Sequence, residues 1–202
     1  MAGWRGRGLL CAALLSVSAC GGGNTPAPAM PEEEYAALTP EEAMAAEREA
    51  LSRCGRVTQE GYCGVRFGMP ADEAQKVFPV QFEGSEVRDG ADLSPNRCYE
   101  LFAVAPVTGI SFLVEGGKIG RLDVLTEAVR TAEDFGVGTQ ALAIRTHYGD
   151  GLYVETNALE PDITDLTATV GATKYVFEIQ DGLVRSWRAG IEPTIAYVAH
   201  CG

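Results

Sequence analysis

Two segments of the chain share one pattern: residues 67–78 read FGMPADEAQKVF, and residues 137–148 read VGTQALAIRTHY. The two stretches align without a gap, and each has the pattern of a strand end, a glycine and a short amphipathic helix. The apolar helix positions match in order: Ala71, Ala74 and Phe78 with Ala141, Ile144 and Tyr148. Because the spacing i, i+3, i+7 places residues on one helical face, each helix is expected to bury that face. The chain therefore predicts two repeats, over about residues 64–130 and 131–202.

Each predicted helix is followed by strand patterns that end in a hairpin. The turns are Gly116-Gly117, between residues 111–115 and 118–124, and Asp181-Gly182, between residues 175–180 and 183–188. Gly-Gly and Asp-Gly supply the positive φ values that a two-residue hairpin requires. The order of helix and then strands, twice, predicts an α+β fold with the helices packed on one face of an antiparallel sheet. The opposite face would be open, and we expect a ligand to bind there.

The amino terminus predicts an export signal with a lipid anchor. Arg5 and Arg7 precede an apolar run, residues 9–17, which is far shorter than the roughly 20 residues that span a bilayer. The run ends in the sequence VSAC, which looks like a bacterial lipobox with Cys20 as the acyl acceptor. An ordinary secretory signal with an accidental cysteine is the alternative. Several acyl chains would hold the protein on a membrane, since each buried methylene contributes about 0.8 kcal/mol.

Cleavage before Cys20 would remove residues 1–19 as the signal peptide and leave residues 20–38 as a lipidated tether. Gly21, and not Asp, follows the cysteine, which by resemblance to the usual lipoprotein sorting rule implies the outer membrane, with the domain facing the periplasm. The cleavage takes two Arg and no acid, so the formal net charge changes from −12 to −14. This acidity excludes a nucleic-acid partner, because phosphate neutralisation needs clustered cations.

Residues 39–63 predict a helix and a disulfide loop. Thr39-Pro40-Glu41-Glu42 has the pattern of an N-cap, a first-turn proline and a capping-box glutamate, which begins a helix that ends near Arg53.

Four cysteines remain after Cys11 and Cys20 are set aside: Cys54, Cys63, Cys98 and Cys201. An even number in an exported protein predicts two disulfides, with three possible connectivities, of which we favour Cys54 with Cys63 and Cys98 with Cys201. A zinc site is the alternative, but the chain has no Cys-x-x-Cys pair, and His200 is the one imidazole near these cysteines in sequence. We therefore expect no metal and no cofactor.

Phe67-Gly68-Met69 before a short helix, with a second glycine-started helix about seventy residues later, resembles the duplicated helix–sheet architecture of the beta-lactamase inhibitor protein. Each half is similar to the small lipoprotein of the outer-membrane barrel assembly machinery. The likeness covers about residues 64–190, and the second copy departs from it, with Thr139 where the first has Met69. The resemblance implies the fold, and no inhibitor contact residue is carried over.

The layout also resembles a group of uncharacterised proteobacterial lipoproteins. The shared motifs are Arg66-Phe67-Gly68-Met69, Cys98-Tyr99-Glu100-Leu101, VFEIQD at residues 176–181, Trp187-Arg188-Ala189-Gly190 and Tyr197-Val198-Ala199-His200-Cys201. Members are sometimes labelled lectins, which implies carbohydrate binding. Because Cys98 and Cys201 both belong to this layout, the resemblance favours their pairing.

The sequence offers weak support for catalysis, and we expect no enzymatic activity. An enzyme needs a nucleophile with a base, a carboxylate pair or a metal cluster in a pocket. The Ser, Asp and Glu residues lie in no GxSxG or HExxH context. His147 is the best candidate base, but it aligns with Val77 of the first repeat, so we interpret it as a partly buried structural residue.

The binding candidates lie in the two predicted hairpins: Arg121, Asp123, Tyr175, Glu178, Trp187 and Arg188. A Trp beside an Arg could stack on a sugar or anchor a protein. Core packing of Trp187 is the alternative, because it aligns with Leu122. The four charged residues have the alternative of solvated cross-strand pairs.

Two functions follow from this combination. The first is a non-enzymatic envelope lipoprotein that binds another protein, such as an envelope component, a lytic enzyme or a delivered toxin. The second is a lectin-like lipoprotein that binds glycan. Two or more exposed aromatics side by side on the open face would favour sugar, and a mixed charged and apolar patch would favour protein.

Overall fold

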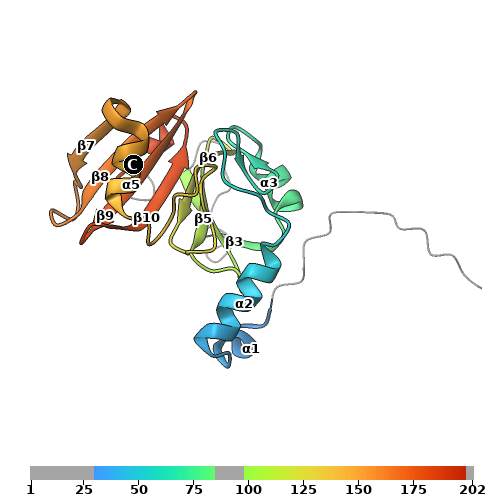
Figure 1. Ribbon diagram of the computed structural model, residues 1–202. Coiled ribbons are helices and arrows are strands. Elements are labelled where there is room, and N and C mark those ends of the chain that lie inside the picture. Colours follow the sequence, from blue (N-terminus) through green and yellow to red (C-terminus); the bar gives the residue numbers. More distant parts are fainter. Residues whose placement is uncertain (1–29, 85–97, 199–202) are drawn as a thin grey trace, which may run out of the picture.

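The structure is a computed structural model, and it describes residues 30–84 and 98–198. The predicted helix start is confirmed, because α2 (Pro40–Ala50) begins after Thr39, whose side chain forms the reciprocal capping box with Glu42. A short helix, α1 (Glu32–Ala36), lies within residues 20–38, the predicted tether. Three acidic residues in its first turn favour that helix, since they complement the amino-terminal end of the dipole. Figure 1 shows α1 and α2 extending away from the sheet.

The main sheet contains eight antiparallel strands in the order β3-β4-β5-β6-β10-β9-β8-β7. Their bounds are β3 Phe82–Gly84, β4 Cys98–Ala103, β5 Ile110–Glu115, β6 Lys118–Val124, β7 Leu152–Thr156, β8 Thr164–Val170, β9 Thr173–Gln180 and β10 Leu183–Gly190. The remaining elements are β1 (Gly61–Tyr62), β2 (Val65–Arg66), α3 (Ala71–Val77), α5 (Ala141–Tyr148), and the 3-10 turns η1 (Gly149–Gly151) and η2 (Thr194–Ala196). The α+β class with a large antiparallel sheet is confirmed.

The strand order is symmetric about the contact between β6 and β10, so each half consists of one helix followed by four strands. The same backbone bonds attach the start of each helix to its hairpin. In the first half, the amides of Gly68, Ile119 and Ala71 donate to the carbonyls of Ile119, Met69 and Gly117; in the second half, the amides of Gly138, Val184 and Ala141 donate to those of Val184, Thr139 and Gly182. Thr139 therefore takes the backbone role of Met69, because that role needs a carbonyl and an amide and no particular side chain. Asp123 and Arg188 are equivalent residues of the two halves, and they also face each other across β6 and β10. The internal two-fold axis therefore passes between them.

The two hairpins also match in their turns and bulges. Gly116 and Gly117 both have positive φ, as do Asp181 and Gly182, which confirms the predicted turn geometry. Each second strand then has an irregularity at the equivalent place, after Ile119 in β6 and after Val184 in β10.

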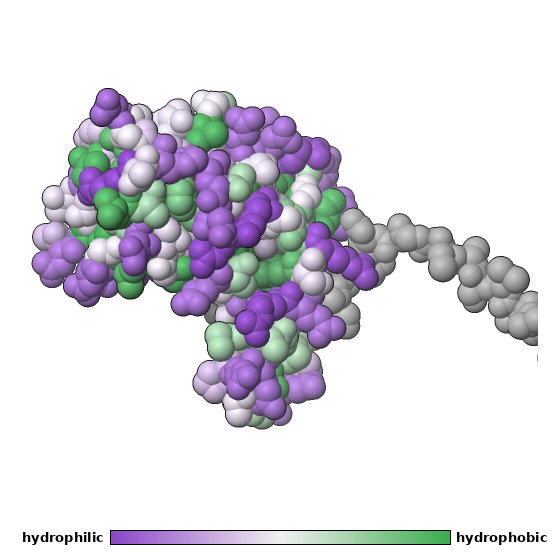
Figure 2. Space-filling model, viewed as in Figure 1, coloured by the Kyte–Doolittle hydropathy of each residue, from purple (hydrophilic) through white to green (hydrophobic). Residues whose placement is uncertain are grey.

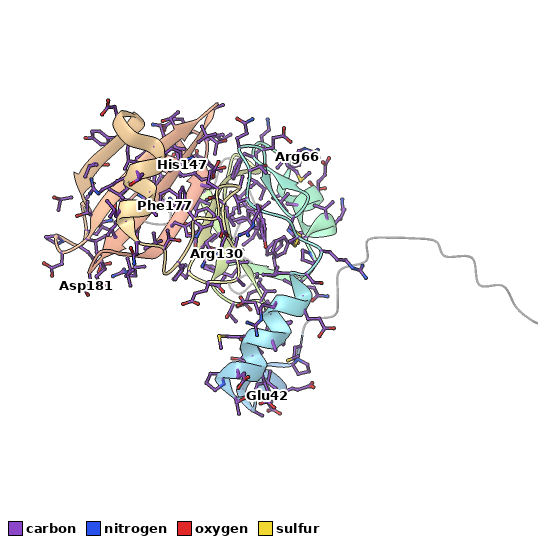
Figure 3. The ribbon with its side chains drawn as sticks, in the orientation of Figure 1. Glu42, Arg66, Arg130, His147, Phe177 and Asp181 are labelled. Carbon is purple, nitrogen blue, oxygen red and sulfur yellow. A yellow bond between two sulfur atoms is a disulfide. The ribbon has the colours of Figure 1, made fainter. Side chains whose placement is uncertain are left out.

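One face of the sheet forms the core with α3 and α5. Ala71, Ala74 and Ile144 are buried on the helices and Phe78 directly after α3, as the helical spacing predicts, whereas Ala141 and Tyr148 are half-buried. Figure 1 shows α5 lying over the strands of the second half, and Figure 3 places Phe177 of β9 beneath it. The aromatic residues of this core include Tyr62, Phe78, Phe82, Phe112, Phe135, Tyr148, Tyr175, Phe177 and Trp187. On the side of the molecule seen in Figure 2, hydrophilic and hydrophobic residues are interspersed.

Helix α2 is attached to the first half by a polar contact that the sequence did not suggest. Glu47, which is buried, accepts hydrogen bonds from the hydroxyl of Thr126 (2.8 Å) and the amide of Thr108 (3.3 Å). Burial raises the pKa of Glu47 from its ordinary value, although both hydrogen bonds oppose the shift. Within residues 30–84 and 98–198, no helix is both long enough and apolar enough to cross a membrane.

The structure tests part of the predicted disulfide pairing. The disulfide between Cys54 and Cys63 is present, as predicted. Cys98 is disulfide-bonded, whereas its predicted partner Cys201 and the predicted acyl acceptor Cys20 lie outside the described residues.

Candidate functional site

Strand alternation places the predicted charged residues together on the face opposite the helices. Arg121 and Asp123 lie on β6, Glu178 on β9 and Arg188 on β10. Successive side chains of a strand point to opposite faces, so the neighbours of these residues enter the core while the charged groups share the open face. The alternative interpretation as solvated pairs is wrong, because Arg121 and Arg188 are only 3% and 8% exposed.

Arg121 attaches the carboxy-terminal part of the chain to the sheet. Its Nε donates to Asp123 Oδ2 (2.8 Å), and its Nη1 donates to the carbonyls of Thr194 (3.2 Å) and Tyr197 (2.9 Å). Glu100 of β4 lies 3.8 Å from Nη2 of the same guanidinium. Residues 191–198, which we call the crossing segment, are thus held over the open face by a buried cation.

Arg188 forms the corresponding centre in the second half. Its Nη1 donates to Glu178 Oε1 at 2.6 Å, and its Nη2 lies 3.6 Å from Asp165 Oδ2. Asn157 donates from Nδ2 to Asp165 Oδ1 at 3.0 Å. The hydroxyl of Ser186 also donates to Glu178, on the oxygen that Arg188 does not use.

Carboxylates outnumber cations in this cluster, since four acids share two guanidinium groups. Burial raises the pKa of Asp123 and of Asp165, and the nearby arginines only partly offset the effect. Desolvation disfavours the ionised form of an acid, so an added hydrogen-bond donor or cation would stabilise these carboxylates.

The cluster forms one side of a cavity of about 680 Å³. Four exposed apolar side chains surround its mouth: Phe102, Leu125, Leu159 and Val198. Glu100, Arg121, Asp123, Glu178, Ser186 and Arg188 provide its polar lining. A mouth of this kind can take an apolar group, while the lining can pair with polar atoms that follow it.

Two of the predicted binding residues do not fit this site. Tyr175 is 1% exposed and belongs to the helix-covered core, because it lies two residues before Phe177 on β9 and so points to the same face of the sheet. Burial raises its pKa to about 12. Trp187 borders the cavity, but its ring stacks on Phe177 at 6.0 Å between centroids, so core packing is its main role. Both belong to the opposite face because side chains alternate along a strand.

His147 also differs from its expected role. It lies on α5, on the helix-covered side of the sheet, and is exposed and not partly buried. Its ring packs edge-on against Phe135, with 5.3 Å between centroids. This position is opposite to the cavity.

The sequence interpretation missed several residues of the site: Glu100, Asp165, Asn157, Thr194 and Tyr197. Of these residues, only Glu100 and Asp165 could have been recognised from the sequence pattern. Glu100 interrupts the apolar run of β4, and Asp165 occupies the equivalent position of β8, since each faces the same place on the next strand. The crossing segment left no such signal, because its contacts use backbone carbonyls.

No family model matches the chain, and no curated protein does so. Solved structures that are similar to it in fold include three of bacterial proteins. They are an extracellular protein containing an SCP domain from Bacillus anthracis (8% identity, TM-score 0.43, 64% of this chain and 45% of that chain), the uncharacterized protein YfeY from Escherichia coli (12%, 0.48, 68% and 100%), and the DUF4309 family protein YjgB from Bacillus subtilis (12%, 0.41, 75% and 97%). The chain thus spans less than half the length of the Bacillus anthracis protein.

Proposed function

We propose that the protein is a non-enzymatic, lipid-anchored envelope protein that binds another protein through the open face of its sheet. The observation that carries the proposal is the cavity with an apolar mouth and a buried charged lining. Protein interfaces combine apolar anchors with polar groups in this way.

The composition of the mouth favours protein over glycan. Among the described residues, Phe102 is the one large aromatic at this cavity that is well exposed, at 39%. Tyr153 of β7 is also exposed, but β7 is an edge strand and β5, β6, β10, β9 and β8 lie between it and β4, so the two rings are not side by side. The ring of Trp187 is in the core, and the hydroxyl of Tyr197 donates to Glu115. A sugar site built on stacking needs a free ring face, and usually more than one.

A position-specific cross-linking experiment tests the binding proposal. A photoreactive amino acid replaces Leu125 at the mouth, or Leu142 on α5 as a matched control, since both leucines are exposed. In the natural host, Leu125 should give one protein adduct and Leu142 none. Phe102→Asp should reduce the yield of the Leu125 adduct about tenfold or more, because loss of a central apolar contact weakens binding by about that factor.

Two outcomes would overturn the binding proposal. One is the absence of a protein adduct from Leu125 and from a second mouth position, Leu159. The other is an adduct that free glycan abolishes, which would favour the lectin-like function instead.

The anchor is proposed separately, from the sequence VSAC and the acyl acceptor Cys20. Cys20→Ser should move the protein from the membrane fraction to the soluble fraction, and Cys11→Ser should leave the fractionation unchanged. A Cys20→Ser protein that stays in the membrane fraction would contradict the anchor without affecting the binding proposal.

A further inference from the structure

A second cavity, of about 320 Å³, lies on the same open face. It is the counterpart of the first cavity under the internal two-fold. Glu100, Phe102, Ser111, Asp123 and Gly109 line the first cavity, and their equivalents Asp165, Thr167, Val176, Arg188 and Lys174 line the second.

The two cavities are neighbours separated by the crossing segment. Arg188 and Val198 line both of them. Ile195 and Ala196 contribute to the second cavity, and Tyr197 to the first. One partner that covers the crossing segment would therefore reach both cavities.

The second cavity differs from the first in chemistry. The aromatic Phe102 of the first mouth is replaced by Thr167, and exposed polar groups of β7, Glu155 and Thr156, complete the lining. Tyr153 and Val198 add apolar surface, but the lining as a whole is more polar than that of the first cavity and suits a hydrogen-bonding or charged group.

The charges favour a cation. Lys174 pairs with Glu192, and Arg188 is shared by Glu178 and Asp165. Glu155 lies near enough to raise the pKa of Asp165, and nothing among the described residues forms an ion pair with it. The lining holds two acids, Glu155 and Asp165, and two cations, Lys174 and Arg188. Both cations already pair with carboxylates, so Glu155 is the acid that an incoming ammonium or guanidinium would meet.

We propose that the second cavity is a subsite for the same protein partner, which inserts a Lys or Arg side chain there while an apolar segment enters the first cavity. This inference rests on the proposed function. The partner is thus a protein that presents an apolar segment and a basic residue on either side of the crossing segment.

The test uses the full chain in the natural host, with a photoreactive amino acid at Phe102 or at Tyr153. Tyr153 lines the second cavity and is 62% exposed, so its replacement removes little packing. Both positions should give an adduct with the same protein. A second position on the second cavity, Thr156, covers the case in which the Tyr153 variant folds poorly.

Charge removal tests the chemistry of the subsite. Glu155→Gln should lower the adduct yield about two- to fivefold, which is the range for loss of one exposed ion pair. Glu41→Gln is the matched control, because it removes an exposed acid on α2, which projects from the sheet, and should leave the yield unchanged.

The outcomes separate the two proposals. An adduct from Phe102 but none from Tyr153 and Thr156, or adducts with two different proteins, would overturn the second subsite and retain the proposed function. No adduct from any position would overturn both. An unchanged yield with Glu155→Gln would overturn the cationic assignment.

Discussion

The two halves of the sheet share a backbone but differ in what their open faces hold. At equivalent positions, Gly120 and Arg121 of β6 correspond to Arg185 and Ser186 of β10. The first pair receives the crossing segment, since Thr194 packs against Gly120 and Arg121 binds its carbonyls.

In the second half, the same positions bind a different loop. Arg185 donates two hydrogen bonds to Glu160, at 2.8 and 2.7 Å, and Ser186 bonds within the sheet. The comparison shows that the hydrogen-bonded bulge is retained, while the side chains at the bulge decide which segment covers each half.

Loss of Arg121 should separate the stability of the two halves most clearly. Arg121→Met should lower the free energy of unfolding by about 3–5 kcal/mol, because it leaves Glu100 and Asp123 buried without their cation. Its counterpart change, Ser186→Ala, should cost about 1 kcal/mol, the value of one hydrogen bond. Urea unfolding of both variants measures the difference. Equal losses would mean that the two halves do not differ in the way proposed.

The bulge glycine gives a smaller effect. A Cβ at Gly120 would collide with the Thr194 side chain, so Gly120→Ala should cost about 1–3 kcal/mol through overpacking. Arg185→Ala, at the equivalent bulge, should leave the unfolding midpoint nearly unchanged, because its ion pair with Glu160 is exposed. If Gly120→Ala also leaves the midpoint of thermal unfolding unchanged, the crossing segment is not packed tightly on the first half.

The smallest expected effect concerns the contact of α2, which only the first half makes. Because burial raises the pKa of Glu47 above its unfolded value, its contribution to stability is fully present below about pH 4.5 and is lost as pH rises through the folded pKa. The stability of the native chain relative to Glu47→Gln should therefore decrease as the pH rises from below about 4.5 through the folded pKa of Glu47. Glu41→Gln, at an exposed position of the same helix, should show no such trend. A constant difference across this pH range would contradict the buried setting of Glu47.

The sequence was sufficient for the features that depend on local pattern. The capping box at Thr39, the two hairpin turns and the buried helix faces each follow from residues within a few positions of one another. The matching patterns of residues 67–78 and 137–148 also predicted the repeated helix and sheet. Such features are local because turn geometry and helical spacing are properties of short segments.

The site, in contrast, depends on contacts between distant parts of the chain. Glu178 and Tyr175 lie on the same strand but point to opposite faces of the sheet. Which residues of a strand point to which face is fixed by its pairing with distant strands. The same pairing buries Arg121 with Glu100 and brings residues 191–198 over the open face, through contacts that span more than seventy residues and use backbone carbonyls. No pattern within the chain encodes such contacts, because carbonyl groups are common to every residue and their partners are selected by the fold.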